Sequence, residues 1–259
     1  MTDQVTVLGL LGLLGLSIGS FINVVAYRVP LKRSVMRPPS ACPNCNHKLS
    51  WRENIPVISW LVLRGTCSEC GIHFSIRYLI VEVLTGVVFA GTVAVIGVDW
   101  VLPAYLWFAG VTITLTLTDL DHKLIPNRIL YPGIVVGAIL LVGGAVAAGD
   151  PQGAIRALLA GASYFGALLV IALVAPAGGF GFGDVKLAIL LGMFTGYLGW
   201  GQMSVAFFFA FLLGGVLSIL LLITGTKGRK DAIPFGPYLV LGAYVAIVAG
   251  DRILDWYLA

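Results

Sequence analysis

Residues 5–27 read VTVLGLLGLLGLSIGSFINVVAY, a continuous run without a formal charge. A helix needs about 20 mostly apolar residues to cross the hydrocarbon core of a bilayer, so this stretch is long enough to span it. Further apolar runs of similar length follow at residues 78–98, 101–118, 129–149, 154–175, 185–200, 202–224 and 234–250. This repetition predicts an all-α polytopic membrane protein with about eight transmembrane helices. The short run at 185–200 leaves seven as the alternative.

The overall composition supports a membrane protein. The chain is 59% hydrophobic and only 11% charged, whereas soluble domains carry about 25% charged residues. The first run does not resemble a cleaved secretory leader, because only Asp3 is charged before it and no small-residue cleavage site precedes the basic segment. We therefore expect residues 1–27 to be retained as the first transmembrane helix.

The basic residues predict how the chain is oriented. With eight spans, 14 of the 16 lysines and arginines fall on one face, and only Arg156 and Arg252 fall on the other. Cytoplasmic loops of membrane proteins are enriched in Lys and Arg, so the basic face is predicted to be cytoplasmic, with both termini outside. The later basic residues on that face are Lys123, Arg128, Lys186, Lys227, Arg229 and Lys230.

Residues 28–77 form the long polar segment and contain two Cys-x-x-C pairs, Cys42 with Cys45 and Cys67 with Cys70. Four thiolates with this spacing are typical of a closed structural zinc site. We predict a small cytoplasmic zinc-ribbon-like insertion, followed by a multi-span core at residues 78–259. The basic charge of segment 28–77 has two interpretations. It can set the orientation of the chain in the membrane and attract anionic lipid headgroups, or it can form a site for an anionic group of a substrate or cofactor. No nucleic-acid partner is expected.

Four carboxylates lie at or near membrane depth, where ionisable groups are expensive and usually functional. They are Glu82, Asp119, Asp121 and Asp184. Asp119 and Asp121 end one apolar run, and periodicity alone cannot choose between them. We expect Pro126 to stop that helix.

Asp184 closes a glycine-rich stretch that begins at Gly178 and includes Gly181 and Gly183. Glycines at this density allow a peptide backbone to approach closely. The stretch lacks the spacing and the Lys-Ser/Thr ending of a phosphate loop. An aspartate that only caps the next helix is the structural alternative.

The predicted topology places Asp119 and Asp184 at the same cytoplasmic membrane boundary. Two carboxylates there, without an evident Ser-His or Cys-His arrangement, favour hydrolysis of the aspartic-protease type. One carboxylate would activate water and the other would protonate the scissile group.

In these motifs the chain resembles the type IV prepilin peptidase family, the leader peptidase/N-methyltransferases. The resemblance includes both cysteine pairs, the spacing from Asp119 to Pro126, and Gly181-x-Gly183-Asp184. It also covers Gly19–Pro30, Ser50–Trp60 and Ile76–Tyr78 leading to Glu82. The resemblance assigns the two catalytic aspartates to Asp119 and Asp184, and leaves Asp121 as a neighbour that tunes the site.

The resemblance implies a substrate and a second activity. The substrates would be prepilin or pseudopilin precursors that enter from the membrane and are cut at the cytoplasmic face of the bacterial inner membrane. The new N-terminal amine would then be methylated from S-adenosylmethionine. We expect Glu53, Asn54, Arg77 and Glu82 to serve this second step, with folding of the ribbon onto the membrane as their structural alternative.

Helix dipoles suggest separate roles for the two aspartates. An anion is stabilised at a helix N-terminus, where Asp184 is expected, and destabilised at a C-terminus, where Asp119 is expected. We hypothesise that Asp184 is the base acting on water and Asp119 is the acid. The alternatives to the two-activity enzyme are a peptidase without methyl transfer and a zinc-stabilised membrane scaffold or transporter.

Overall fold

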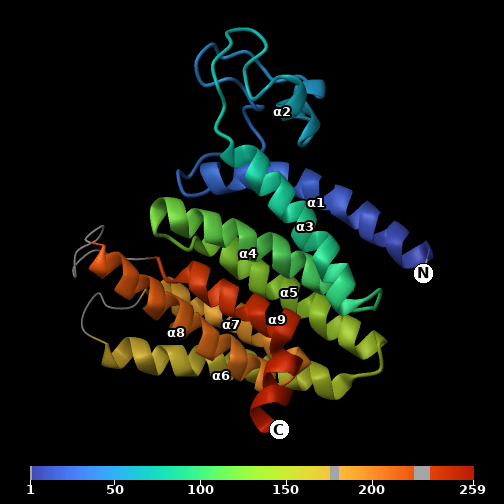
Figure 1. Ribbon diagram of the computed structural model, residues 1–259, viewed down its shortest axis with the longest axis vertical. Helices are drawn as coiled ribbons and strands as arrows, with labels where there is room; N and C mark the ends of the chain where they lie inside the picture. The colour runs from blue at the N-terminus through green and yellow to red at the C-terminus, as the bar shows by residue number, and fades with distance from the viewer. Residues whose placement is uncertain (1, 176–180, 225–233) are drawn as a thin grey trace. The chain divides into compact units, whose positions relative to one another are not determined.

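The computed structural model describes residues 2–175, 181–224 and 234–259. The predicted basic residues Lys227, Arg229 and Lys230, and the start of the glycine-rich stretch at Gly178, lie outside these ranges. The chain divides into two compact units, Met1–Val98 and Asp99–Ala259 (Figure 1). The helices are α1 (Thr2–Arg28), η1 (Arg52–Asn54), α2 (Ile58–Val62), α3 (Arg77–Ile96), α4 (Leu102–His122), α5 (Asn127–Ala147), α6 (Pro151–Val174), α7 (Phe182–Leu198), α8 (Trp200–Ile223) and α9 (Gly236–Leu258).

Each predicted apolar run forms one long helix, which confirms the all-α fold. Among the described residues, six helices are long and apolar enough to cross a membrane: α1, α3, α5, α6, α8 and α9. The sequence predicted about eight transmembrane helices. The two predicted runs that are not among these six are α4 and α7. Helix α7 has only 17 residues, and α4 contains several buried threonines and Asp119. The two helices that carry the predicted catalytic aspartates are therefore the two that are not long and apolar enough to be counted as spans.

In the first unit, α1 packs along α3 at close range. A Cβ placed on Gly19 would lie 2.7 Å from the Cα of Glu82, so only a glycine allows the two backbones to approach this closely. Small residues are typical of such contacts between membrane helices, because van der Waals packing rather than the hydrophobic effect drives their association. The segment between α1 and α3 holds the four cysteines, η1 and α2.

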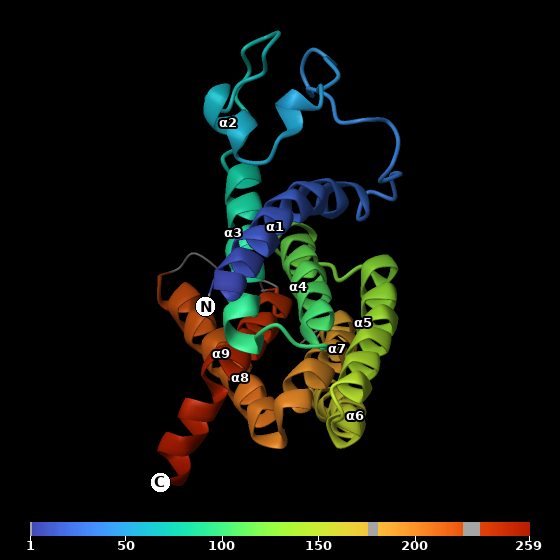
Figure 2. The ribbon, with the colours of Figure 1, turned by 90° about the vertical axis from the view of Figure 1, so that its right-hand side faces the viewer.

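In the second unit, α7 is the central helix and contacts each of the other five. Its most extensive partner is α6, and the two run alongside one another in Figures 1 and 2. Gly192 lies against Ala160 and Gly161 of α6, and a Cβ on it would meet the Ala160 carbonyl oxygen at 2.7 Å. The phenol of Tyr105 donates a hydrogen bond of 2.8 Å to the Phe194 carbonyl, which ties α4 to α7.

Arg156 of α6 lies at the C-terminal end of α7. Its Nε donates to the Gly196 carbonyl at 2.9 Å, and its Nη2 donates to the Tyr197 carbonyl. Carbonyls in the last turn of a helix have no partner within the helix, and a cation there also complements the helix dipole. The arginine that the sequence places on the non-cytoplasmic face thus lies at the opposite end of α7 from Asp184.

Helix α4 ends before the expected proline. It stops at His122, and Lys123 takes a left-handed conformation (φ 51°) while its N–H donates to the Asp119 carbonyl. Pro126 then precedes α5 in an extended conformation. The left-handed residue ends the helix, and Pro126 sets the start of the next one.

Candidate active site and metal centre

Asp119 lies in the last turn of α4 and is only 5% exposed. Its Oδ2 accepts a hydrogen bond of 3.1 Å from the backbone N–H of Gly236, the first residue of α9. Asp121, two residues later, is exposed. The first N–H groups of a helix have no partner within the helix, so a carboxylate is well placed to accept from them. The side chain of Asp119 is therefore held inside the second unit by an end of another helix.

Asp184 lies in the first turn of α7 and is 7% exposed. Gly181 occupies the N-cap position, and no side chain caps this helix, so the structure does not support the capping alternative for Asp184. A Cβ on Gly181 would lie 2.8 Å from Asp184 Oδ2. The other oxygen, Oδ1, is buried and accepts no hydrogen bond from the residues that the structure describes. Buried polar atoms are nearly always satisfied, so this oxygen is suited to bind water or substrate.

The two aspartates lie at the same end of the second unit. Ile125 approaches a neighbour of each: a Cβ on Gly183, next to Asp184, would meet its Cβ at 3.0 Å, and a Cβ on Gly236, which donates to Asp119, would meet its Cδ1 at 3.3 Å. The two carboxyl groups are close enough for their charges to interact. The structure thus brings together the two aspartates that the sequence predicted, along with both predicted glycines.

A lysine lies beside this end of α7. Lys186 Nζ donates to Asn127 Oδ1 at 3.2 Å. It also lies 5.0 Å from the ring centre of Phe182 and 5.5 Å from that of Tyr131, within the range of a cation–π interaction. These contacts fix the first turn of α7 to the start of α5.

Sequence reasoning missed Gly236, Ile125 and Asn127. The signal for Gly236 was present in Pro234-Phe-Gly-Pro237, since a proline at the start of an apolar run marks a helix N-terminus. Nothing in the sequence indicated that this N-terminus lies at Asp119, because the contact joins residues that are 117 positions apart.

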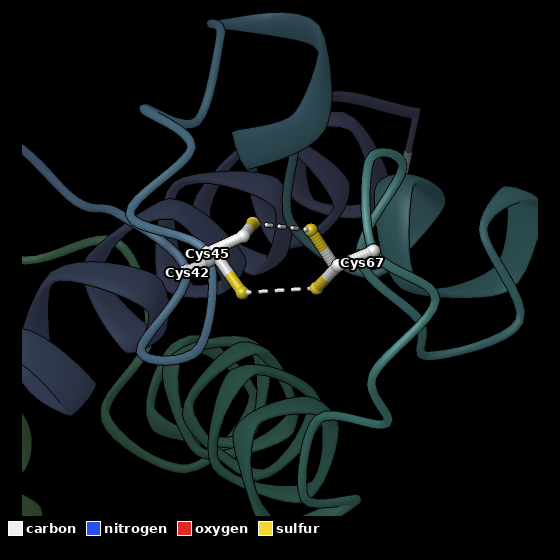
Figure 3. Close-up of side chains that lie close together, drawn as sticks. Cys42, Cys45 and Cys67 are labelled. Carbon is white, nitrogen blue, oxygen red and sulfur yellow. Dashed lines mark hydrogen bonds between the residues drawn. The ribbon is translucent and has the colours of Figure 1, made fainter.

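The four cysteines form one cluster in the first unit (Figure 3). Their sulfur atoms all lie within 4.8 Å of one another. The Cys42–Cys70 and Cys45–Cys67 sulfur distances are 3.7 and 3.8 Å, far beyond a disulfide bond. Zinc–sulfur bonds of about 2.3 Å in a tetrahedron place the sulfur atoms roughly 3.8 Å apart. The cluster therefore fits a metal ion held by four thiolates.

The two cysteine pairs have the same backbone conformation. In the first, the Cys42 N–H donates to the His47 carbonyl and the Asn46 N–H donates to the Cys42 carbonyl. The second repeats this pattern from Cys67 to Ile72 and from Gly71 to Cys67. Asn46 and Gly71, which follow the second cysteine of each pair, have φ values of 59° and 69°.

Glu53 joins the two halves of this insertion. Its carboxylate accepts hydrogen bonds from the Ser68 hydroxyl and, at 2.8 Å, from the Ser50 N–H. It also lies 3.3 Å from His47 Nε2. The Ser68 hydrogen bond, followed by those of Ser50 and His47, lowers the pKa of Glu53 to about 2. His47 is thus occupied by Glu53, and the metal-ligand cluster found among the described residues consists of the cysteines alone. These contacts favour the structural alternative for Glu53.

The other three residues predicted for methyl transfer have different environments. Asn54 ends η1 and is exposed. Arg77 begins α3, is exposed, and its N–H donates to Ser75 Oγ. Glu82 is 9% exposed, and its Oε2 accepts a hydrogen bond of 2.8 Å from the N–H of Val57. Glu82 is therefore the buried carboxylate of the first unit.

Comparison with known families matches both units. Residues 13–96 match the bacterial peptidase A24 N-terminal domain, and residues 106–219 match the type IV leader peptidase family. The chain belongs to the type IV leader peptidase family. The aspartates Asp119 and Asp184 lie within the second match, and the four cysteines and Glu82 lie within the first.

Curated members of this family resemble the chain over most of its length. A prepilin leader peptidase/N-methyltransferase from Aeromonas hydrophila is 34% identical over 95% of this chain and 92% of the relative. One of the same name from Bacillus subtilis (strain 168) is 33% identical over 97% of this chain and 98% of the relative. One from Myxococcus xanthus (strain DK1622) is 38% identical over 84% of this chain and 64% of the relative. No solved structure matches the chain.

Proposed function

We propose that this leader peptidase family member is an aspartic endopeptidase of type IV prepilins or pseudopilins. In this proposal it also N-methylates the new N-terminus with S-adenosylmethionine. The observation that carries the peptidase is the buried oxygen Asp184 Oδ1, which has no described donor and lies at the same end of the unit as Asp119. The relatives' names support prepilins as substrates and methyl transfer as the second activity.

The proposed reaction needs only water and the two carboxyl groups. One carboxylate accepts a proton from water as the water oxygen attacks the scissile carbonyl carbon. The other carboxyl protonates the carbonyl oxygen, and the carbon–nitrogen bond then breaks as the amine leaves with a proton. Two adjacent carboxyl groups share protons as one coupled unit.

The division of roles between the aspartates stays a prediction. The sequence argument placed Asp119 at a helix C-terminus and Asp184 at an N-terminus. The structure adds the N-terminus of α9 beside Asp119, which also stabilises a negative charge. Helix dipoles therefore no longer separate the two groups. Infrared spectra of Asp119→Asn and Asp184→Asn would identify which carboxyl is protonated: a protonated Asp119 supports its role as the acid, and a protonated Asp184 contradicts it.

We place the active site at the cytoplasmic face of a bacterial inner membrane. The support is the concentration of Lys and Arg on the face where Asp119 and Asp184 lie, as cytoplasmic loops require. Prepilin leaders would then be cut after entering laterally from the bilayer. The four-thiolate cluster is proposed to hold a structural zinc ion, since a filled site leaves no position open for catalysis.

A mass measurement tests the proposed function. The purified chain is incubated with a prepilin-like substrate and S-adenosylmethionine, and the product is weighed by mass spectrometry. Loss of the leader with gain of one methyl group is expected. Cleavage without methylation would leave a peptidase alone. An uncut substrate that a related enzyme does process would contradict the peptidase and favour the scaffold or transporter.

Substitution of Gly236 tests the geometry around Asp119. A Cβ at this position would lie 2.7 Å from Asp119 Oδ2, so Gly236→Ala should displace the carboxylate. Misplacing a reacting group by about 1 Å can reduce the rate roughly 10²-fold, and we expect a 10- to 100-fold lower cleavage rate. Gly215→Ala is the matched control, because a Cβ there meets nothing within 4 Å. Equal rates for the two variants would contradict the role of the Gly236 contact.

A further inference from the structure

The second half of α4 carries four alternating threonines, and one hydroxyl group among them differs from the other three. Three of the hydroxyls donate to carbonyls one turn earlier in α4, over 2.6 to 2.9 Å: those of Thr112, Thr114 and Thr118. This bond is a common way for a threonine within a helix to satisfy its hydroxyl. Thr116 Oγ1 is also buried, yet it has no hydrogen-bond partner among the residues that the structure describes.

We propose that Thr116 is a positioning residue for Asp119. Its hydroxyl binds a water molecule that also forms a hydrogen bond with the Asp119 carboxyl group. This water is separate from the one that attacks the scissile carbonyl. The inference rests on the proposed peptidase activity, and it adds a residue that the sequence motifs did not single out.

Spacing along α4 brings the two side chains together. Thr116 and Asp119 are three positions apart, so they are neighbours on the helix surface with Cβ atoms about 5–6 Å from one another. Helical side chains lean towards the N-terminus, which carries the Asp119 carboxyl group back over the turn that contains Thr116. A hydroxyl and a carboxyl group at this separation are suited to a bridge of one water molecule.

The face of α4 that carries these side chains lies against α9. Asp119 accepts a hydrogen bond of 3.1 Å from the N–H of Gly236 in the first turn of α9. Two turns earlier on the same stripe of α4, the Thr112 hydroxyl lies 3.1 Å from the hydroxyl of Tyr244. Thr116 falls between these two contacts. Its buried hydroxyl therefore lies beside the boundary of α4 with α9, within the second unit and next to Asp119.

Burial is the reason to expect a water molecule at this hydroxyl. A buried hydroxyl without a partner is costly, and such groups are almost always bonded to the protein or to an ordered water. A buried water in turn needs at least two polar partners. Thr116 Oγ1 supplies one, and Asp119 Oδ1 supplies the other, because the Gly236 N–H donates to Oδ2.

A second hydrogen bond to Asp119 would fix the plane of its carboxyl group. The terminal torsion of an aspartate has a broad energy minimum, so the single bond from Gly236 leaves the carboxyl group able to turn. With Oδ2 held by Gly236 and Oδ1 held by the water on Thr116, that rotation stops. Alignment of a reacting group raises the rate of the chemical step. The contribution of Thr116 should therefore appear in kcat, because its hydroxyl does not contact the substrate.

Thr116→Val tests the proposal against a matched control on the same helix. Valine keeps the branched shape of threonine without the hydroxyl, and Thr114→Val makes the same change where the hydroxyl donates to the Gly110 carbonyl at 2.6 Å. With the purified full-length chain and a prepilin-like substrate, we expect Thr116→Val to lower kcat roughly 10-fold and to leave KM within about twofold. Thr116→Ser restores a hydroxyl and should recover most of kcat. Thr114→Val should cleave as the unmodified chain does.

Infrared spectra of the same variants give a readout that does not depend on cleavage. The carboxyl bands that are missing from Asp119→Asn belong to Asp119, and they should shift in Thr116→Val but not in Thr114→Val. Bands that stay in place in Thr116→Val, or that shift equally in both valine variants, would overturn the proposal and leave the peptidase standing. A raised KM with unshifted bands would place the hydroxyl against the substrate and overturn it as well. An unmodified chain that leaves a competent prepilin uncut would instead overturn the proposed peptidase itself.

Discussion

Replacing Asp184 by asparagine should stop the cleavage of a prepilin substrate while leaving the chain folded. The asparagine has the same shape but can neither accept a proton from water nor donate one to the substrate. A positioned acid or base contributes about 10²- to 10⁴-fold to a rate, so we expect a fall of at least 10²-fold. Asp119→Asn should have a similar effect, because either change breaks the same coupled pair. The measurement is the rate of leader removal, followed by mass spectrometry.

Asp121→Asn is the control for this prediction. Asp121 lies only two residues from Asp119 but is exposed, whereas Asp119 is 5% exposed and accepts the Gly236 N–H. We expect the Asp121→Asn variant to cleave at a rate within roughly tenfold of the unmodified chain, because Asp121 takes no part in the chemical step. A larger loss in Asp121→Asn than in Asp119→Asn would contradict the assignment of the first aspartate. Unchanged zinc content in each variant would show that the first unit is intact.

The sequence predicted the elements well, because each depends on local composition. Membrane-length apolar runs identify helices almost without reference to their neighbours. The turns after the cysteine pairs were also predictable, since Asn46 and Gly71 are residue types that tolerate positive φ. The ligand set follows from spacing alone, and the structure gathers all four cysteines.

Long-range contacts were not predictable from local patterns. Periodicity could not separate Asp119 from Asp121, because each faces a different stripe of one helix. The contact that distinguishes them comes from α9, which places the Gly236 N–H beside Asp119. A cavity of about 540 Å³ that Glu82 helps to line likewise depends on α1, α3 and the insertion packing together. Residues distant in sequence define both sites, and a single sequence carries little information about such pairings.

Removal of one thiolate should release the metal from the first unit. Cys67 is 3% exposed, and its sulfur faces that of Cys45. Structural zinc contributes about 10–16 kcal/mol of apparent binding free energy in small zinc modules, and that energy is also folding energy. We therefore expect Cys67→Ser to lose its zinc, measured by metal analysis of the purified protein. Trypsin should then cut rapidly at the Lys and Arg residues of segment 28–77.

The histidines provide the decisive control for this prediction. His47 and His73 are near enough in sequence to replace a cysteine ligand, but His47 already contacts Glu53 at 3.3 Å and His73 lines the cavity beside Glu82. With four thiolates in place the tetrahedron is complete, so His47→Ala should retain one zinc ion per chain. Zinc lost from His47→Ala, or retained by Cys67→Ser, would contradict the four-cysteine site. Zinc loss together with rapid trypsin cleavage in Cys67→Ser alone would mean that the insertion folds around its metal.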